Sequence, residues 1–357
     1  MNKKTSISIL LFTLAFSLEA QGVTEKFKDA FRSEALQVNG YGQIIANYSQ
    51  NPDRGMAKTS SNCSFDVARA IIFAQGRLGE NRQFGYMLMY DFGPGSSMHE
   101  LYGEWLPKEA FNLRFGQFKV PFTIENPMSP TRNEAIYFSR SVQAMAGSAG
   151  DYNQYGRDGA VSVKGGRDAG LQVSGKLFRK DDFHQVEYYA GLFNGTGLNT
   201  KDNNNRKDFV GTIYYQPLKG LKAGGSVYSG EITLADSVAG LNAGSYSRKG
   251  WTAGAVYDAK RCYIRSEYIA NRTGSISREG YYATAVWKFV PGRWEVFGKY
   301  DYYDADKSVA DNETQDITFG LNYYMAWLTR IQLNYIHTDD RALGKNNAVA
   351  AQLQLYF

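Results

Sequence analysis

Arginine and lysine side chains give this sequence its clearest capacity for binding chemistry. Several lie on segments in which apolar and polar residues alternate, and three more fall in the irregular stretch 119–155. A guanidinium group offers an oxyanion two parallel hydrogen bonds, and an ammonium group offers a compact charge. We select eight candidate anion-binding residues: Lys119, Arg132, Arg140, Arg114, Arg69, Arg265, Lys299 and Arg330. Lys176 and Lys222 are expected to face the same side of their segments as these residues.

Carboxylates accompany these cations. Glu267 lies two positions after Arg265, and Glu125 and Glu134 fall within the irregular stretch. The alternative interpretation is therefore a set of balanced, solvated charges. Strict selectivity for phosphate is not expected.

The residues that could support other chemistry do not form a recognisable pattern. His99, His184 and His337 fall at strand ends or turns, without a nearby serine or carboxylate at triad spacing. There is no HxH or CxxC pair, and the Asp/Asn-rich stretch 200–208 lacks the glycine and final glutamate of a calcium loop. We expect no enzyme, no metal and no cofactor, with an outer-membrane hydrolase as a remote alternative.

Apolar and polar residues alternate with period two through most of the chain, which predicts β-strands. Residues 294–302, 316–323 and 330–335 show the alternation most clearly. The candidate strands run to about 9–11 residues, the length that a tilted strand needs to cross a bilayer. A soluble sandwich is the alternative.

Aromatic residues and connection lengths favour a membrane barrel. Tyrosine and tryptophan lie at expected strand ends, where they would form girdles: Tyr90, Trp105, Trp251, Tyr302, Tyr303, Tyr323 and Tyr324. Tight and long connections are expected to alternate throughout, except near residues 155–185. Seventeen segments fit a strand, but a barrel with both ends in the periplasm needs an even number. Removing 156–164 predicts an all-β, antiparallel transmembrane barrel of about 16 strands.

The chain divides into three expected parts. Lys3 and Lys4 precede a short apolar run, which predicts a signal peptide over 1–20. Residues 21–36 have a helical rhythm and are expected to form a short periplasmic helix or tether, ahead of a barrel over 37–357. The formal charge of +5 is small for 357 residues and does not favour nucleic acid as a partner.

The stretch 119–155 contains three prolines and no period, yet it is rich in apolar residues. A long third loop folded into the lumen and narrowing it is the preferred interpretation. A cap outside the barrel or at a subunit contact is the alternative. Lys119, Arg132 and Arg140 are the strongest anion-binding candidates because this loop would occupy the narrowest point.

The chain ends on an alternating segment, 349–357, that closes with Phe357. Sheet closure requires it to pair with 37–48, which places Phe357 at the periplasmic girdle. Cys63 and Cys262 are expected at opposite ends of the strands, too far apart for a disulfide.

Three segments resemble the phosphate-selective porin O and P family, in its Bacteroidetes branch: 115–126 (FGQFKVPFTIEN), 166–178 (GRDAGLQVSGKLF) and 188–211 (YYAGLFNGTGLNTKDNNNRKDFVG). The resemblance implies a sixteen-stranded outer-membrane porin, often trimeric, with its third loop in the pore. It also implies that basic residues of the wall and loop conduct anions, phosphate among them.

Together these observations predict an outer-membrane porin that passes small hydrophilic solutes and prefers anions. A structural or adhesive barrel with a closed pore is the alternative. The expected partners are solutes or anions, outer-membrane lipid, a homotrimer and, during insertion, the outer-membrane assembly machinery.

Overall fold

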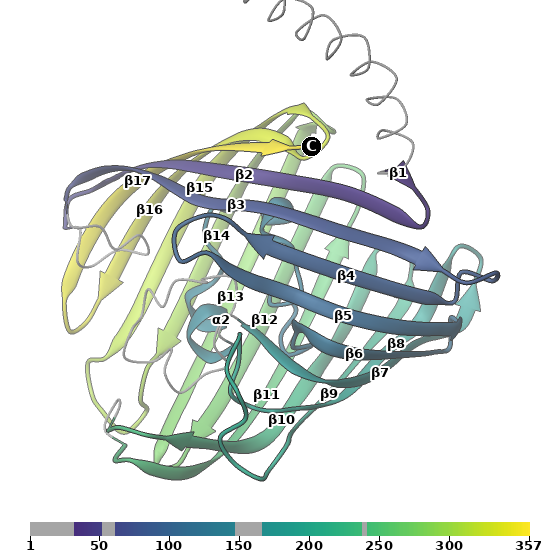
Figure 1. Cartoon of the computed structure of the whole chain (residues 1–357). Helices are drawn as coiled ribbons and strands as arrows, with labels where there is room; N and C mark the ends of the chain where they lie inside the picture. Colours follow the sequence, from purple (N-terminus) through teal and green to yellow (C-terminus); the bar gives the residue numbers. More distant parts are fainter. Residues whose placement is uncertain (1–31, 52–60, 147–165, 238–240) are drawn as a thin grey trace, which may run out of the picture.

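The structure is a computed structural model that describes residues 32–51, 61–146, 166–237 and 241–357. Strands β2–β17 form a closed barrel (Figure 1). The strand bounds are β2 Leu36–Ser49, β3 Cys63–Leu78, β4 Phe84–Asp91, β5 Ser97–Lys108, β6 Phe111–Lys119, β7 Arg167–Lys180, β8 Phe183–Phe193, β9 Asp208–Leu218, β10 Leu221–Leu234, β11 Gly244–Asp258, β12 Cys262–Thr273, β13 Ile276–Val290, β14 Trp294–Asp304, β15 Glu313–Ala326, β16 Thr329–Asp340 and β17 Gly344–Tyr356.

Each barrel strand pairs antiparallel with the next strand in sequence, and β17 pairs with β2 to close the ring. The predicted sixteen-stranded antiparallel barrel is confirmed. Residues 156–164, which the prediction removed, lie outside the described residues. A short additional strand, β1 (Arg32–Ser33), pairs with the start of β2.

The expected N-terminal parts are described only at their end. Residues 1–31 lie outside the described residues, so the structure does not describe the predicted signal peptide. Because Arg32–Ser33 form β1, the helical alternative for 21–36 does not extend to them. Among the described residues, no helix is long and apolar enough to cross a membrane.

The two faces of the sheet differ as the period-two pattern predicts. In β14–β16, Val296, Phe319 and Leu333 are exposed on the outside, whereas Lys299 and Asp316 on the alternate positions are buried inside. Outward aromatic residues pair near both ends of the strands, for example Trp105 with Phe111 and Tyr281 with Tyr302. Two residues assigned to the girdles, Tyr303 and Tyr324, instead face inward, because they occupy the inward positions of β14 and β15.

A bulge in β3 explains a segment whose facing the sequence leaves ambiguous. The register shifts between Gln43 and Ile44 of β2, which pair with Arg69 and Val67. The extra residue reverses the alternation. As a result Val67 faces outward at 48% exposure, whereas Arg69 and Ile71 face inward.

The connections are less regular than predicted. Seven short turns lie at one end of the barrel, the end that holds both the start of β2 and the end of β17. The opposite end carries the long connections, but 92–96, 274–275 and 341–343 are also short there. The expected strict alternation of tight and long connections is therefore wrong at β4–β5, β12–β13 and β16–β17.

The C-terminal residue is fixed by the first strand. The Gly40 N–H donates to the Phe357 carbonyl at 2.9 Å, and the Phe357 N–H donates to the Gly40 carbonyl at 3.0 Å. Cys63 and Cys262 are free thiols, as expected.

The described part of the connection between β6 and β7 packs on the inner face of the barrel. It contains a 3-10 helix, η1 (Pro130–Arg132), and a helix, α2 (Arg140–Ala146). Helix α2 contacts β12, β13 and β14, and all seven of its residues are buried (Figure 1). We call the described part, residues 120–146, the inner loop.

Candidate channel lining and loop anchors

Prolines and side-chain hydrogen bonds fix the backbone conformation of the inner loop where it leaves β6. Prolines 121, 127 and 130 lack the N–H group that a strand ladder requires. The Asn126 side chain donates to the carbonyls of Val120 and Gly166 at 2.8 and 2.9 Å. Thr123 adopts φ +72° and accepts a hydrogen bond from the Asn126 N–H. These bonds close the base of the loop where it leaves β6.

Arg265 of β12 joins two carboxylates of the inner loop. Its guanidinium lies 2.8 Å from Glu125 and 3.1 Å from Glu134, and it also donates to the Asn133 side chain at 3.1 Å. The Arg265 and Glu125 side chains are almost completely buried. A buried charge of this kind is tolerated only when it is paired and hydrogen-bonded. Arg265 therefore holds the loop to the wall.

Glu125 is ionised within this cluster. Burial alone would raise the pKa of its carboxyl, but Lys299 and Arg265, together with a hydrogen bond from the Ser139 N–H, hold that pKa below its ordinary value. The carboxylate therefore supplies a negative charge to the anchor at neutral pH.

A second anchor lies at the start of α2. The Arg140 guanidinium donates to both carboxylate oxygens of Asp316 on β15, at 2.6 and 2.9 Å. The Arg140 N–H also donates to Asp301 of β14. Lys299 lies 3.7 Å from Asp301 and donates to the Tyr137 carbonyl at 3.3 Å. All these charged groups are buried.

Neutral side chains and one further arginine bind the loop backbone. Arg330 donates to the Asn133 carbonyl at 2.7 Å, and Gln332 donates to the Glu134 carbonyl at 2.8 Å. Asn334 accepts from the Ile136 N–H at 2.9 Å. Three successive inward positions of β16 thus satisfy polar groups of the inner loop, which otherwise would be buried at a cost of about 1–3 kcal/mol each.

Apolar contacts complete the attachment. Phe122, Val142 and Met145 of the inner loop belong to a buried cluster with Ile269 and Tyr282 of the wall. Gly280 allows the close approach of α2, because a Cβ there would lie 2.5 Å from the Ser141 side chain and 2.7 Å from the Tyr302 carbonyl.

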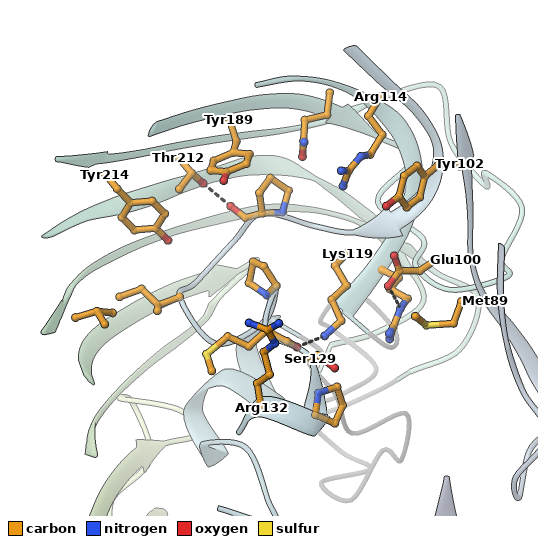
Figure 2. Close-up of a pocket in the computed structure, with 18 of the residues that line it drawn as sticks. Met89, Glu100, Tyr102, Arg114, Lys119, Ser129, Arg132, Tyr189, Thr212 and Tyr214 are labelled. Carbon is orange, nitrogen blue, oxygen red and sulfur yellow. Dashed lines mark hydrogen bonds and ion pairs between the residues drawn. The ribbon is translucent and has the colours of Figure 1, made fainter. Parts of the chain in front are cut away.

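The opposite side of the inner loop faces an open pocket of about 640 Å³. Figure 2 shows Tyr102, Arg114, Tyr189 and Tyr214 of the wall across from Arg132 and Ser129 of the loop. The wall residues come from strands β5–β10, with contributions from β2, β4, β11 and β12.

Five cations line this pocket: Arg114, Lys119, Arg132, Arg167 and Lys222. Three of them have carboxylate partners: Arg114 with Glu104 at 2.9 Å, Arg167 with Glu100 at 3.2 Å and Lys222 with Glu187 at 3.4 Å. Among the described residues that line the pocket, these five cations stand against one carboxylate, Glu100. The pocket is therefore electropositive.

Two of the pocket cations come from the β6 end and the inner loop. Lys119 donates to the carbonyls of Asn126 and Met128. Arg132 is exposed at the end of η1 and forms no ion pair with any described residue. Its guanidinium is the cation most accessible to a passing solute.

The structure divides the eight candidate residues into two groups. Arg114, Lys119 and Arg132 line the pocket. Arg265, Lys299 and Arg330 contact the inner loop from the wall, and Arg140 of that loop pairs with Asp316 of the wall. Arg69 belongs to neither group and donates to Gln43 of β2 at 2.9 Å. Sequence reasoning missed Arg167 and the inward tyrosines. Arg167 lies in the segment 166–178, but no alternation precedes it that could have fixed its facing.

The histidines lie apart from one another and from the pocket. His99 is 3.9 Å from Asp91, His184 contacts Glu109, and His337 contacts Asn347. Within the described ranges, no group of three or more histidine, cysteine, aspartate or glutamate side chains could hold a metal ion.

Solved structures with the same architecture are porins and channels of the outer membrane. An anion-selective porin from Comamonas acidovorans superposes with a TM-score of 0.65 at 15% identity, covering 90% of this chain and 99% of the other. OmpF of Salmonella typhi, solved with daunomycin, gives 0.64 at 14% identity and covers 90% and 97%. The outer-membrane channel DcaP of Acinetobacter baumannii gives 0.60 at 13% identity with the same coverage. At these identities the likeness shows the fold.

Sequence comparison identifies the family. A search of characterised proteins found no match. The family model described as phosphate-selective porin O and P matches residues 38–227 and 224–357, almost the whole barrel. The chain belongs to the phosphate-selective porin O and P family.

Proposed function

We propose that this protein forms a water-filled diffusion channel in the outer membrane for small hydrophilic solutes, with a preference for anions. The observation that carries the proposal is the predominance of cations over carboxylates among the described residues that line the pocket beside the inner loop. A charged constriction with low-dielectric walls raises the local concentration of counter-ions and thereby their flux. Family membership and the porin fold support a channel rather than an enzyme.

The preference is for anions in general, with phosphate as one of them. Glu100, Glu104 and Glu187 lie close to three of the cations and compete with a solute for their hydrogen bonds. Arg132, which is exposed at the pocket, provides a cationic group without such competition from any described carboxylate. One of the similar structures is itself an anion-selective porin, which supports the same direction of selectivity.

The proposal includes the assembly of the protein. Residues 1–20 act as a signal peptide for export through the periplasm, and the assembly machinery inserts the barrel into the outer membrane. The active form is a homotrimer.

The test is the reversal potential of the purified protein in planar bilayers under a KCl gradient. The account predicts single-channel steps and a reversal potential displaced toward the chloride equilibrium potential. A closed structural barrel would give no steps, and a potential displaced toward potassium would contradict the anion preference.

A further inference from the structure

Aromatic rings and apolar groups line more of the pocket beside the inner loop than its five cations do. Twelve of its 21 lining residues are tyrosine, methionine, proline, isoleucine or valine. Five of the twelve are inward-facing tyrosines, which come from five different strands: Tyr41, Tyr102, Tyr189, Tyr214 and Tyr263. This composition resembles a small-molecule site, in which apolar walls surround a few polar groups.

The tyrosines and cations are arranged together. The Arg114 guanidinium lies 4.3 Å from the centre of the Tyr102 ring, and the Lys222 ammonium lies 4.9 Å from the centre of the Tyr214 ring. Figure 2 shows Tyr189 between Tyr102 and Tyr214 on the same side of the pocket. An anion near either cation therefore lies beside an aromatic ring.

A small inorganic oxyanion uses only the cations of such a surface and gains nothing from its rings. It must lose part of its hydration on entering, and only hydrogen-bond donors and positive charge compensate that loss. Tyrosine rings instead offer dispersion and stacking contacts, which stabilise a flat apolar group. The size of the pocket, about 640 Å³, also accommodates an organic solute.

We propose that the preferred solute of this channel is an anion that carries an aromatic ring, with the ring against Tyr189 and Tyr102 and the charge toward Arg114 or Arg132. The inference rests on the proposed anion-preferring channel and specifies its solute class. The solute interacts by stacking and ion pairing alone, and no covalent step is involved.

Phenyl phosphate and methyl phosphate provide a matched comparison, because they share the anionic headgroup and differ in the ring. Each is added to one side of a planar bilayer that carries chloride current through the wild-type protein. We expect phenyl phosphate to reach half-block at a concentration about 2- to 10-fold lower, the effect of one aromatic contact. Equal half-block concentrations would overturn the inference.

Substitutions of single tyrosines test which rings contact the aromatic solute. In Tyr189→Leu the advantage of phenyl phosphate should fall toward one, while methyl phosphate blocks as in the wild type. Tyr281→Leu is the control, because Tyr281 faces the outside of β13 and should leave the ratio unchanged. If phenyl phosphate still reached half-block at a lower concentration than methyl phosphate in both Tyr189→Leu and Tyr102→Leu, the proposed ring contacts would be contradicted.

Failure of this inference can be separated from failure of the proposed function. A displaced reversal potential with equal block leaves the anion channel intact and removes only the aromatic solute. If the protein carries no current, calorimetric titration of the detergent-solubilised barrel with the same two compounds still decides the inference. Tighter binding of phenyl phosphate would support it, and equal binding would refute it.

Discussion

The two sides of the barrel lumen use the same residue types for different purposes. The anchored wall, β12–β16, carries arginine, lysine and carboxylate side chains that are buried against the inner loop. The open wall, β5–β10, carries arginine and lysine side chains that line the pocket. An inward-facing cation is therefore a candidate for solute binding only where no other protein segment covers it.

Energetics explain why the two walls differ. On the anchored wall a charge loses its hydration, so removal of its partner leaves a buried charge uncompensated at about 3–5 kcal/mol. On the open wall the Arg114 and Lys222 side chains stay about one-third exposed in their ion pairs, and exposed pairs contribute about 0–1 kcal/mol, whereas Arg167 is buried beside Glu100. Substitutions on the anchored wall should consequently affect stability, and those on the open wall should affect permeation.

The largest expected effect follows from Asp316→Asn. It leaves the Arg140 guanidinium buried without its carboxylate, at a cost of about 3–5 kcal/mol to docking of the inner loop. We expect a lower unfolding temperature in detergent and a noisier, larger single-channel conductance. Asp339→Asn is the matched control, because Asp339 pairs with Lys345 at the exposed rim. Equal behaviour of the two variants would contradict the assignment of Asp316 to an anchor.

Acidification should weaken the anchored wall. Because the folded-state pKa of Glu125 is below its ordinary value of 4.5, its contribution is fully present above that value and is lost as pH falls through the lower pKa. We expect the unfolding temperature to fall below about pH 4.5, and the fall should be reduced in Glu125→Gln. An identical acid dependence in both proteins would show that other groups are responsible.

A smaller effect distinguishes two tyrosines. Tyr137 of the inner loop donates its hydroxyl to Asn47 of β2 at 2.8 Å, so Tyr137→Phe should destabilise the protein by about 1 kcal/mol. Tyr189→Phe on the open wall keeps its ring and removes a hydroxyl that faces the pocket, so stability should remain unchanged. Thermal unfolding of the two variants measures the difference, and a reversed order would contradict the division between the walls.

The sequence predicted the barrel well because one simple rule governs it. In β14–β16 the inward facing of Lys299, Asp316 and Arg330 follows directly from alternation, since a lipid-exposed face must be apolar. The period-two rule failed locally at the β3 bulge, where one extra residue reverses the alternation. No residue type in that segment indicates the bulge.

The candidate site was less predictable from the sequence. Arg132 and Arg140 lie eight positions apart in the same irregular stretch, yet one is exposed in the pocket and the other is paired with Asp316. Period two indicates which side chains face inward but not which of them the inner loop covers. That outcome depends on contacts between residues more than 100 positions apart, such as Arg265 with Glu125.

Two substitutions that each remove one positive charge test the division between the anchored wall and the open wall most directly. Arg132→Gln acts in the pocket, and Arg330→Gln acts where the guanidinium is completely buried against the loop carbonyls. The measurement is the reversal potential under the same KCl gradient. The account predicts a clear loss of anion preference for Arg132→Gln and a much smaller one for Arg330→Gln. Equal shifts, or a larger shift for Arg330→Gln, would contradict it.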